Sequence, residues 1–290
     1  MKKLFSLVLA VAMVLSMACF ASAEENTTLT IVAWDVGTTP YYQAQKEAFE
    51  ATHPGVTIEY VDVASQDWDT KAGTMLSGGD TSDLFMVKQN INIMNWAQQG
   101  FAEPLTDYIA KDNYDLSGFV GMEPNYALDG TQYALPFRSD FWVLFYNKTL
   151  FDAAGVAYPT NDMTWEEYAA LAKEMTGKGN CKYGCHYHTW RSAASLFSIL
   201  DGKNTIIDGK YDFMKPTYDM VIAQQKDGIC MDYGYLKTSS LHYSAAFENQ
   251  QCAMVNMGSW FISTLEAYMK DAETKFNWGI VKYPHPAGAE

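Results

Sequence analysis

The feature of this sequence that most constrains its fold is a regular alternation of strand-like and helix-like segments in its first hundred residues. Runs rich in β-branched and aromatic residues at 29–34, 56–61 and 83–87 alternate with helical patterns at 41–52, 68–76 and 91–99. Such alternation predicts an α/β fold with a mainly parallel sheet covered by helices on both faces. Ligands of these sheets bind beyond the carboxyl ends of the strands.

A second constraint is the run Leu135–Lys148, which is rich in aromatic residues. Pro136 is unsuited to the interior of a paired strand, but the residues after it favour a buried strand. Arg138 and Asp140 come just before that strand, and residues two apart share a face of an extended backbone. We interpret the run as a crossing between two lobes, with the charged pair at the mouth of a cleft.

The second half of the chain continues the α/β pattern. Thr164 and Glu167 form a capping box that opens a helix ending near Lys178. Further patterns predict helices at 191–200, 216–226 and 261–270, and strands at 252–257 and 276–281. Because 290 residues suffice for two α/β domains, we place lobe 1 at 24–138 and lobe 2 at 139–282.

The amino terminus has the pattern of a secretory signal peptide. Lys2 and Lys3 precede an apolar stretch, and Ala21-Ser22-Ala23 forms a small-residue cleavage site. We therefore assign residues 1–23 to the signal peptide, with cleavage after Ala23 and an extracytoplasmic mature protein. A lipid anchor at Cys19 is the alternative, but Ser16 stands where an aliphatic residue is expected.

The mature chain is acidic and aromatic. Removing the two lysines of the leader changes the formal net charge from −14 to −16. This balance is unsuited to binding nucleic acid or an anionic membrane, and we expect a monomer without a cofactor. Aromatic residues make up 14% of the chain, more than a core alone calls for, which suggests a stacking site.

Four cysteines remain after cleavage, and an even number in an exported protein predicts disulfides. Three connectivities are possible, of which the simplest joins the local pair and leaves the distant pair together. A zinc site that combines two of these cysteines with His186 and His188 is the alternative. The cysteines are Cys181, Cys185, Cys230 and Cys252.

Four stretches, taken together, resemble extracellular solute-binding proteins of family 1, the maltose-binding-like receptors of ABC sugar importers. They are Trp34-Asp35 with the helix ending in His53-Pro54-Gly55-Val56, Tyr133–Phe137 leading to Tyr146–Lys148, Met163–Tyr168, and Ala246–Met254 followed by Gly258-Ser259-Trp260. The resemblance implies two α/β lobes joined by crossing strands, a carbohydrate ligand in the cleft and permease subunits as partners. It also implies that 283–290 begins a return crossing to lobe 1 whose remainder is absent.

A sugar site needs aromatic platforms and planar polar groups. Trp260, after the Gly258-Ser259 turn, is the best platform candidate, and Trp190 is the next, although either could be a core residue. Arg138 and Asp140 could bind sugar hydroxyls or form a structural ion pair. The remaining candidates are Asp35, Lys88 and Gln89 at the predicted rim of lobe 1, each equally consistent with simple solvation, and His242 and Tyr243.

Other functions fit the sequence less well. A receptor for a polyamine, a peptide or a metal complex is the main alternative, and a polyamine would suit the acidity. A secreted glycoside hydrolase would need two carboxylates that flank the scissile bond, and Asp140 alone has an apolar setting. We find no nucleophile elbow, phosphate-binding glycine loop or HExxH zinc motif. We therefore predict a non-enzymatic binding protein.

Overall fold

The computed structural model describes residues 26–122 and 125–288, which divide into two compact units. Unit 1 ends at Phe137 and unit 2 begins at Arg138. The predicted signal peptide, its cleavage site and Cys19 lie outside the described residues. Within the described ranges, none of the helices combines the length and the apolar character needed to cross a membrane. The lobe limits drawn from the sequence stay predictions.

Unit 1 alternates strands with helices along the chain, in the predicted order. A short hairpin, β4 and β5, follows and has no counterpart among the predicted segments. The elements are β1 (Thr27–Trp34), η1 (Val36–Thr38), α2 (Pro40–Thr52), β2 (Val56–Val63), η2 (Ser65–Asp67), α3 (Trp68–Ser77), β3 (Leu84–Phe85), α4 (Asn90–Gln98), α5 (Thr106–Asp112), η3 (Ser117–Phe119), β4 (Ala127–Leu128) and β5 (Thr131–Gln132).

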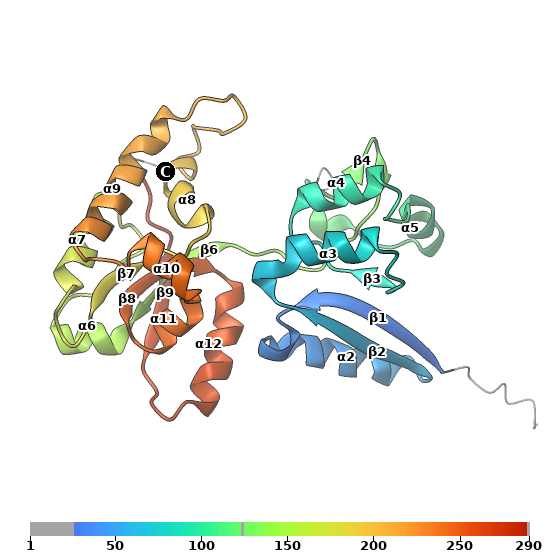
Figure 1. Cartoon of the computed structure of the whole chain (residues 1–290), viewed down its shortest axis with the longest axis horizontal. Coiled ribbons are helices and arrows are strands. Elements are labelled where there is room, and N and C mark those ends of the chain that lie inside the picture. Colours follow the sequence, from blue (N-terminus) through green and yellow to red (C-terminus); the bar gives the residue numbers. More distant parts are fainter. Residues whose placement is uncertain (1–25, 123–124, 289–290) are drawn as a thin grey trace, which may run out of the picture. The chain divides into compact units, whose positions relative to one another are not determined.

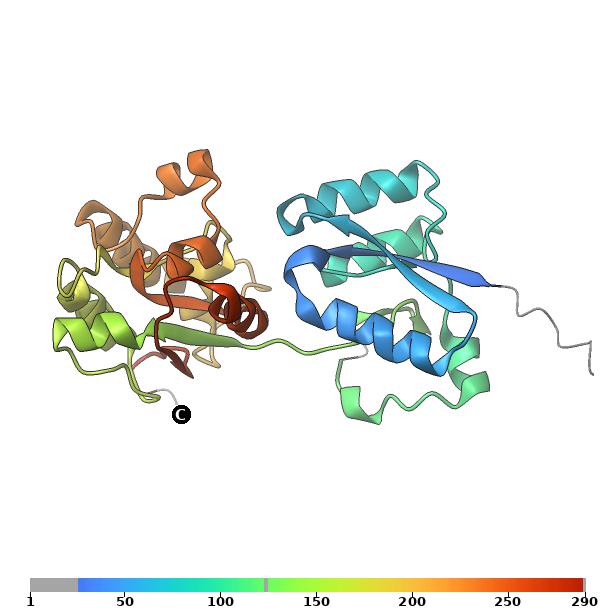
Figure 2. The same cartoon turned by 90° about the horizontal axis from the view of Figure 1, so that it is seen from below.

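The main sheet of unit 1 is parallel, as predicted, with the strand order β2-β1-β3. Helix α2 covers one face of this sheet, and α3 and α4 cover the other (Figures 1 and 2). Because alternate strand residues point to opposite faces, Val32 packs with Trp68 of α3 and Ile93 of α4. The parallel arrangement brings the carboxyl ends of the strands to one edge of the sheet.

Unit 2 contains a larger, mixed sheet with the strand order β7-β8-β6-β9. Strands β7 and β8 are parallel, but β6 is antiparallel to both β8 and β9, so this sheet differs from the parallel sheet of unit 1. The elements are β6 (Trp142–Asn147), α6 (Lys148–Ala154), α7 (Trp165–Met175), β7 (Tyr183–His186), α8 (Ser192–Ile199), η5 (Asp212–Met214), α9 (Lys215–Lys226), α10 (Tyr233–Ser239), α11 (Tyr243–Glu248), β8 (Cys252–Gly258), α12 (Trp260–Asp271) and β9 (Trp278–Lys282).

The two faces of the sheet in unit 2 have separate cores. Leu144 of β6 and Met254 of β8 are buried on one face with residues of α6, α7, α8 and α9. Phe145 and Val255 are buried on the other with residues of α11 and α12. This alternation explains why β6 and β8 read as continuous apolar runs: both of their faces are covered.

The strand predicted to follow Asp140 is present as β6. Strand β6 begins at Trp142, and residues 135–141 have no regular secondary structure. Phe137 and Phe141 are exposed, because the backbone before Trp142 has no paired strand to bury them. The capping box is confirmed: Thr164 Oγ1 accepts a hydrogen bond from the Glu167 backbone, and the Glu167 side chain accepts one from Thr164 N–H.

The predicted disulfides are wrong in this structure, where all four candidate cysteines are buried free thiols. The segment after Cys181 enters strand β7 instead of folding back as a turn, and the Cys181 thiol donates to the backbone oxygen of Tyr183 at 3.0 Å. Cys185 has Cys230 as a neighbour, and not the predicted Cys181. Burial raises the pKa of Cys181 to about 11, so this thiol is protonated at neutral pH.

The zinc alternative also lacks support. Among the described residues, no group of three or more histidine, cysteine, aspartate or glutamate side chains is placed to hold a metal ion. Neighbouring residues of a strand point to opposite faces of the sheet. Cys185 and His186 of β7 therefore face apart and cannot share one metal.

Candidate functional site

The carboxyl end of strand β8 carries the strongest aromatic candidate of unit 2. The strand ends at buried Gly258, and helix α12 begins two residues later with Trp260. A Cβ atom at position 258 would overlap the indole ring of Trp260. Only glycine therefore allows this ring to lie against the backbone, which explains the Gly258-Ser259-Trp260 sequence at the turn.

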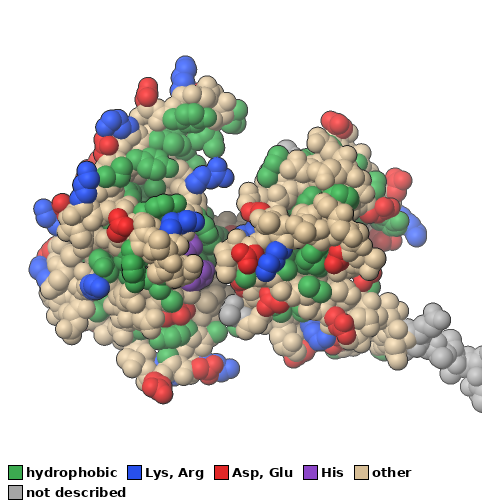
Figure 3. Space-filling view, in the orientation of Figure 1, with side chains coloured by type: hydrophobic (Ala, Val, Ile, Leu, Met, Phe, Trp, Pro, Cys, Tyr) green, Lys and Arg blue, Asp and Glu red, His purple; other side chains and the backbone are tan. Residues whose placement is uncertain are grey.

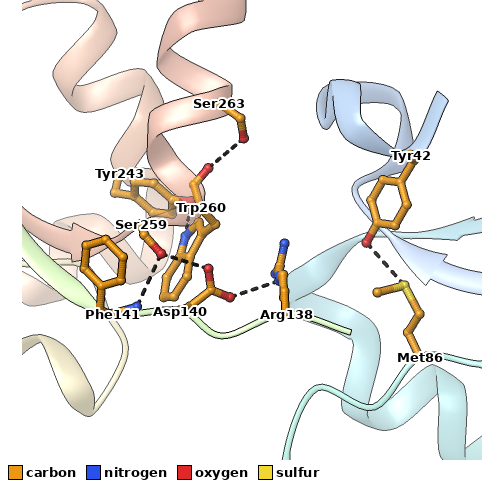
Figure 4. A network of polar contacts seen from close by, with 9 residues as sticks. All are labelled: Tyr42, Met86, Arg138, Asp140, Phe141, Tyr243, Ser259, Trp260 and Ser263. Atoms are coloured by element: carbon orange, nitrogen blue, oxygen red, sulfur yellow. Dashed lines mark hydrogen bonds and ion pairs between the residues drawn. The ribbon is translucent and has the colours of Figure 1, made fainter. Parts of the chain in front are cut away.

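A network of polar contacts ties Arg138 and Asp140 to this turn (Figure 4). Arg138 Nε donates to Asp140 Oδ2 at 2.9 Å, and each side chain is about one quarter exposed. Ser259 Oγ donates to Asp140 Oδ1 at 2.9 Å and accepts from the Phe141 backbone N–H at 3.3 Å. The structure thus brings together Arg138, Asp140, Gly258, Ser259 and Trp260, which the sequence predicted as one site.

Trp260 belongs to an aromatic cluster that we define as Trp142, Trp190, Tyr243 and Trp260. The ring centroids of Trp190 and Trp260 are 6.1 Å apart, and those of Trp142 and Trp260 are 5.7 Å apart. Trp260 Nε1 donates to the Tyr243 hydroxyl at 2.9 Å, which fixes the orientation of the indole (Figure 4). The three tryptophans remain partly exposed, whereas Tyr243 is buried.

Two histidines on or beside strand β7 adjoin the aromatic cluster. His188 contacts Trp190 at a centroid distance of 4.6 Å and Tyr243 at 5.3 Å. Burial lowers the pKa of His186 to about 4 and that of His188 to about 3, so both rings are neutral at neutral pH. In the space-filling view, histidine atoms of unit 2 gather at one place on its surface (Figure 3).

The carboxyl edge of the sheet in unit 1 holds the charged candidates. Asp35 has φ 53° and accepts a hydrogen bond from Ser65 N–H at 2.9 Å, while Lys88 Nζ donates to the Ser65 carbonyl oxygen. Lys88 also lies 6.0 Å from the ring centroid of Trp34. Burial lowers the pKa of Lys88, and the carboxylates of Asp69 and Asp35 oppose that shift.

Gln89 joins the same edge by a different route. Its side-chain amide donates to Asp69 Oδ2, and Asn92 Nδ2 donates to Asp69 Oδ1 at 3.0 Å. The Asp35 and Lys88 candidates therefore meet at Ser65, and Gln89 is linked to them through the charge of Asp69. All three predicted side chains of lobe 1 lie beyond the strand ends, as the parallel sheet requires.

Fixed polar groups lie beside aromatic rings at the edge of unit 2. Asp140 is engaged by both Arg138 and Ser259, so it is held as a hydrogen-bonding group. Aromatic rings beside fixed polar groups suit a neutral polyhydroxylated ligand. The sequence interpretation missed the role of His188, although the spacing of His186 and His188 places both on one face of an extended strand.

Comparisons with known proteins identify relatives of this chain. A family model described as bacterial extracellular solute-binding protein matches residues 35–290. A binding protein of Brucella abortus (strain 2308) is 33% identical over 177 residues, 59% of this chain and 40% of that protein. The sn-glycerol-3-phosphate-binding periplasmic protein UgpB of Escherichia coli (O1:K1 / APEC) is 25% identical over 300 residues, 96% of this chain and 66% of that protein.

One solved structure is similar in both sequence and fold. It is a sugar transporter from Rhizobium etli in an open conformation, 42% identical, with a TM-score of 0.68 and coverage of 91% of this chain and 68% of that chain. This chain spans about two fifths of the length of the Brucella protein, 40%, and about two thirds of UgpB, 66%.

Proposed function

This chain belongs to the bacterial extracellular solute-binding protein family, and from that premise we propose that it captures a carbohydrate for an ABC importer. In this proposal the mature protein acts outside the cytoplasm after its signal peptide is removed. It binds the sugar reversibly, without chemical change, and presents it to permease subunits. The solved relative from Rhizobium etli carries the name sugar transporter, which supports the same ligand class.

The observation that carries the proposal is the combination of the aromatic cluster with the Arg138–Asp140–Ser259 network in unit 2. Sugars present apolar C–H faces bordered by hydroxyl groups, so rings and fixed hydrogen-bonding groups must lie together. Trp260 provides a ring whose orientation is fixed by Tyr243. Arg138 supplies N–H donors, and Asp140 and Ser259 supply acceptors beside it.

The ion pair also supports a neutral ligand. Because Arg138 and Asp140 neutralise each other, the polar network of unit 2 carries no net charge. A sugar phosphate would require an additional cation, and a polyamine would require an unpaired carboxylate. The edge of unit 1 contains the cation Lys88, so a phosphorylated ligand such as the one for which UgpB is named serves as a test case.

The experiment is isothermal titration calorimetry of the full chain with a ligand panel: maltotriose, mannotriose, D-mannitol, sn-glycerol 3-phosphate, spermidine and a tripeptide. We expect saturable binding of at least one saccharide and none of spermidine or the tripeptide. Unchanged saccharide after prolonged incubation, judged by chromatography, would agree with a binding protein. Release of reducing sugar in many turnovers would contradict it, and binding of glycerol phosphate alone would replace the neutral-ligand assignment.

A further inference from the structure

Three histidines of unit 2 form a group next to the aromatic cluster. His186 is the last residue of β7, His188 lies two residues further on, and His242 is the N-cap residue of α11. The ring centroids of His186 and His188 are 6.4 Å apart, and those of His188 and His242 are 5.4 Å apart. We call these three residues the histidine group.

The histidine group supports the rings that the proposed function uses. His188 lies edge-on to Trp190, with 4.6 Å between centroids and an interplanar angle of 86°. His242 contacts Tyr243 at 4.1 Å, and Tyr243 in turn accepts the hydrogen bond from Trp260 Nε1. Displacing these imidazoles would therefore disturb both Trp190 and Trp260.

The group is arranged for neutral imidazoles. His186 is fully buried, and among the described residues neither of its ring nitrogens has a hydrogen-bond partner. Within the same part of the chain, Nδ1 of His188 is also buried without a partner. An added proton on either ring would thus become a buried charge that lacks a nearby acceptor.

The charged and titratable neighbours make protonation still less favourable. His186 faces His242 of α11, whereas His188 faces His242, His186 and Lys237 of α10. Each group that acts on these two rings is basic, so each raises the cost of a positive charge there. Burial is the largest cause of the lowered pKa values, and like-charge repulsion adds to it.

We propose that His186 and His188, with His242 packed against them, hold Trp190 and Trp260 in a sugar-binding arrangement only while the imidazoles of His186 and His188 are neutral. This proposal rests on the proposed function for the identity of the ligand, but not for the ring movement itself. Acidification of the medium then displaces the rings and releases the sugar. The device couples ligand affinity to the pH outside the cell.

Proton linkage sets the size of the effect. A displaced imidazole regains an ordinary pKa of about 6.5, so at about pH 5 His186 and His188 each shift the equilibrium toward the displaced state by about thirtyfold. Apparent affinity falls in proportion to the loss of the binding-competent population. We expect the affinity for a bound saccharide to fall at least about tenfold between about pH 7.5 and about pH 5.

The experiment follows the rings directly by ¹⁹F NMR of the full chain labelled with 5-fluorotryptophan. Trp190→Phe and Trp260→Phe assign the two resonances of interest. Both should shift as the pH falls, while the resonances of Trp34, Trp68 and Trp96 in unit 1 stay constant. In His188→Gln, or in His186→Gln if the first variant folds poorly, the midpoint should move to lower pH and less affinity should be lost. His53→Gln in unit 1 is the matched control and should behave like the unaltered protein.

The proposal is overturned if the Trp190 and Trp260 resonances do not change with pH, or if both histidine variants show the same transition as the unaltered protein. It is also overturned if the unit 1 resonances move at the same pH, because that result indicates global unfolding. Equal affinity for maltotriose or mannotriose at both pH values would overturn it as well. If no saccharide binds even at neutral pH, the proposed function fails, while the ¹⁹F titration still decides whether the histidine group positions the rings.

Discussion

The two units place their candidate ligand groups by the same rule but with different chemistry. In unit 1, Asp35 and Lys88 lie beyond β1 and β3, where they meet at Ser65. In unit 2, His188 and Trp260 lie beyond β7 and β8, where Trp260 belongs to the aromatic cluster and His188 packs against it. Parallel strands bring their carboxyl ends to one edge in both cases, so the topology decides the location and the residue types decide the chemistry.

From this difference we expect a division of work between the units. The edge of unit 1 carries charged groups that are partly neutralised by one another, whereas unit 2 offers rings and an internally paired Arg138–Asp140 network. Rings supply contact area for the apolar faces of a sugar, and they do so without a large cost in side-chain entropy. We therefore expect the aromatic edge of unit 2 to contribute more binding energy than the charged edge of unit 1.

The largest effect that we predict is a change in the free energy of unfolding that differs between the two units. Gly184 of β7 lies so close to α7 that a Cβ atom would overlap the backbone of Ala172, whereas a Cβ at Gly73 of α3 would meet nothing. Gly184→Ala should lower the free energy of unfolding of unit 2 by about 3 kcal/mol. Gly73→Ala should raise that of unit 1 by about 0.5–1 kcal/mol, because glycine is unfavourable inside a helix.

Urea denaturation, followed by far-UV circular dichroism and by fluorescence of single-tryptophan reporters in each unit, measures both changes. A destabilisation of unit 1 by Gly184→Ala would show that the two units unfold as one and would break the comparison. A stable Gly184→Ala variant would show that α7 can move away from β7.

The second effect is a loss of stability of unit 2 at acidic pH. The pKa of His186 is lowered from 6.5 to about 4, so the unfolded chain binds this proton first as the pH falls. The resulting stability of unit 2 is fully present above about pH 6.5 and is lost progressively toward about pH 4, with about 2 kcal/mol lost by about pH 5. Unit 1 holds only His53 of the five histidines, and that ring is exposed.

Unit 2 should therefore lose stability before unit 1 when urea denaturation is repeated between neutral pH and about pH 5. His186→Asn, which cannot be protonated in this range, should weaken the pH dependence of unit 2 by about half, because the lowered pKa of His188 supplies a similar contribution. Equal pH dependence of the two units would instead indicate that carboxylates shared by both control acid unfolding.

Much of the fold could be predicted from the sequence because local patterns and tertiary packing agree. The α/β, periplasmic-binding-protein-like class is confirmed by the fold similarity to the Rhizobium etli protein. The segments Val56–Val63 and Cys252–Gly258 have the predicted strand type because their apolar residues match the burial of their faces. The capping box at Thr164 is purely local and was predictable for that reason.

The errors arise where tertiary contacts decide the structure. Strand β7 contains Gly184 and follows Cys181 closely, features that suggested a turn between Cys181 and Cys185, but pairing with β8 and the close approach of α7 make it a strand. The same strand pairing places Cys185 in β7, and the four cysteines are free thiols where the sequence predicted disulfides. The contact between His188 and Tyr243 joins residues far apart in the sequence, and no local pattern reports such a contact.

The third effect tests the aromatic edge. Trp260→Ala should weaken saccharide binding by about 1–3 kcal/mol, because it removes a ring whose orientation is fixed by Tyr243. Calorimetry on the variant measures the loss, with Trp165→Phe as the control, since Trp165 packs in the core on the opposite face of the sheet. Unchanged affinity with an intact fold would remove Trp260 from the site.

The fourth effect tests the charged edge of unit 1. Lys88→Met leaves the Ser65 carbonyl without its side-chain donor and removes the cation beside Trp34. We expect a loss of about 1 kcal/mol in the stability of unit 1 and a similar or smaller loss in saccharide affinity. The exposed Lys111→Met is the control. A loss larger than that of Trp260→Ala would reverse the proposed division of work.

The smallest effect distinguishes the two functions of the Arg138–Asp140 pair. Asp140→Asn removes the negative charge but keeps an oxygen that can accept the hydrogen bond from Ser259 Oγ. Because each side chain of the pair is about one quarter exposed, the ion pair should contribute only about 0.5 kcal/mol to the free energy of unfolding.

Binding of a saccharide to Asp140→Asn, measured at low and at high salt, then separates the two roles of the pair. If Asp140 accepts hydrogen bonds from sugar hydroxyls, the variant loses affinity to the same extent at both salt concentrations while its stability barely changes. If the pair only fixes the backbone before β6, affinity and stability fall together and the deficit of the variant shrinks at high salt, where the ion pair of the unaltered protein is already screened.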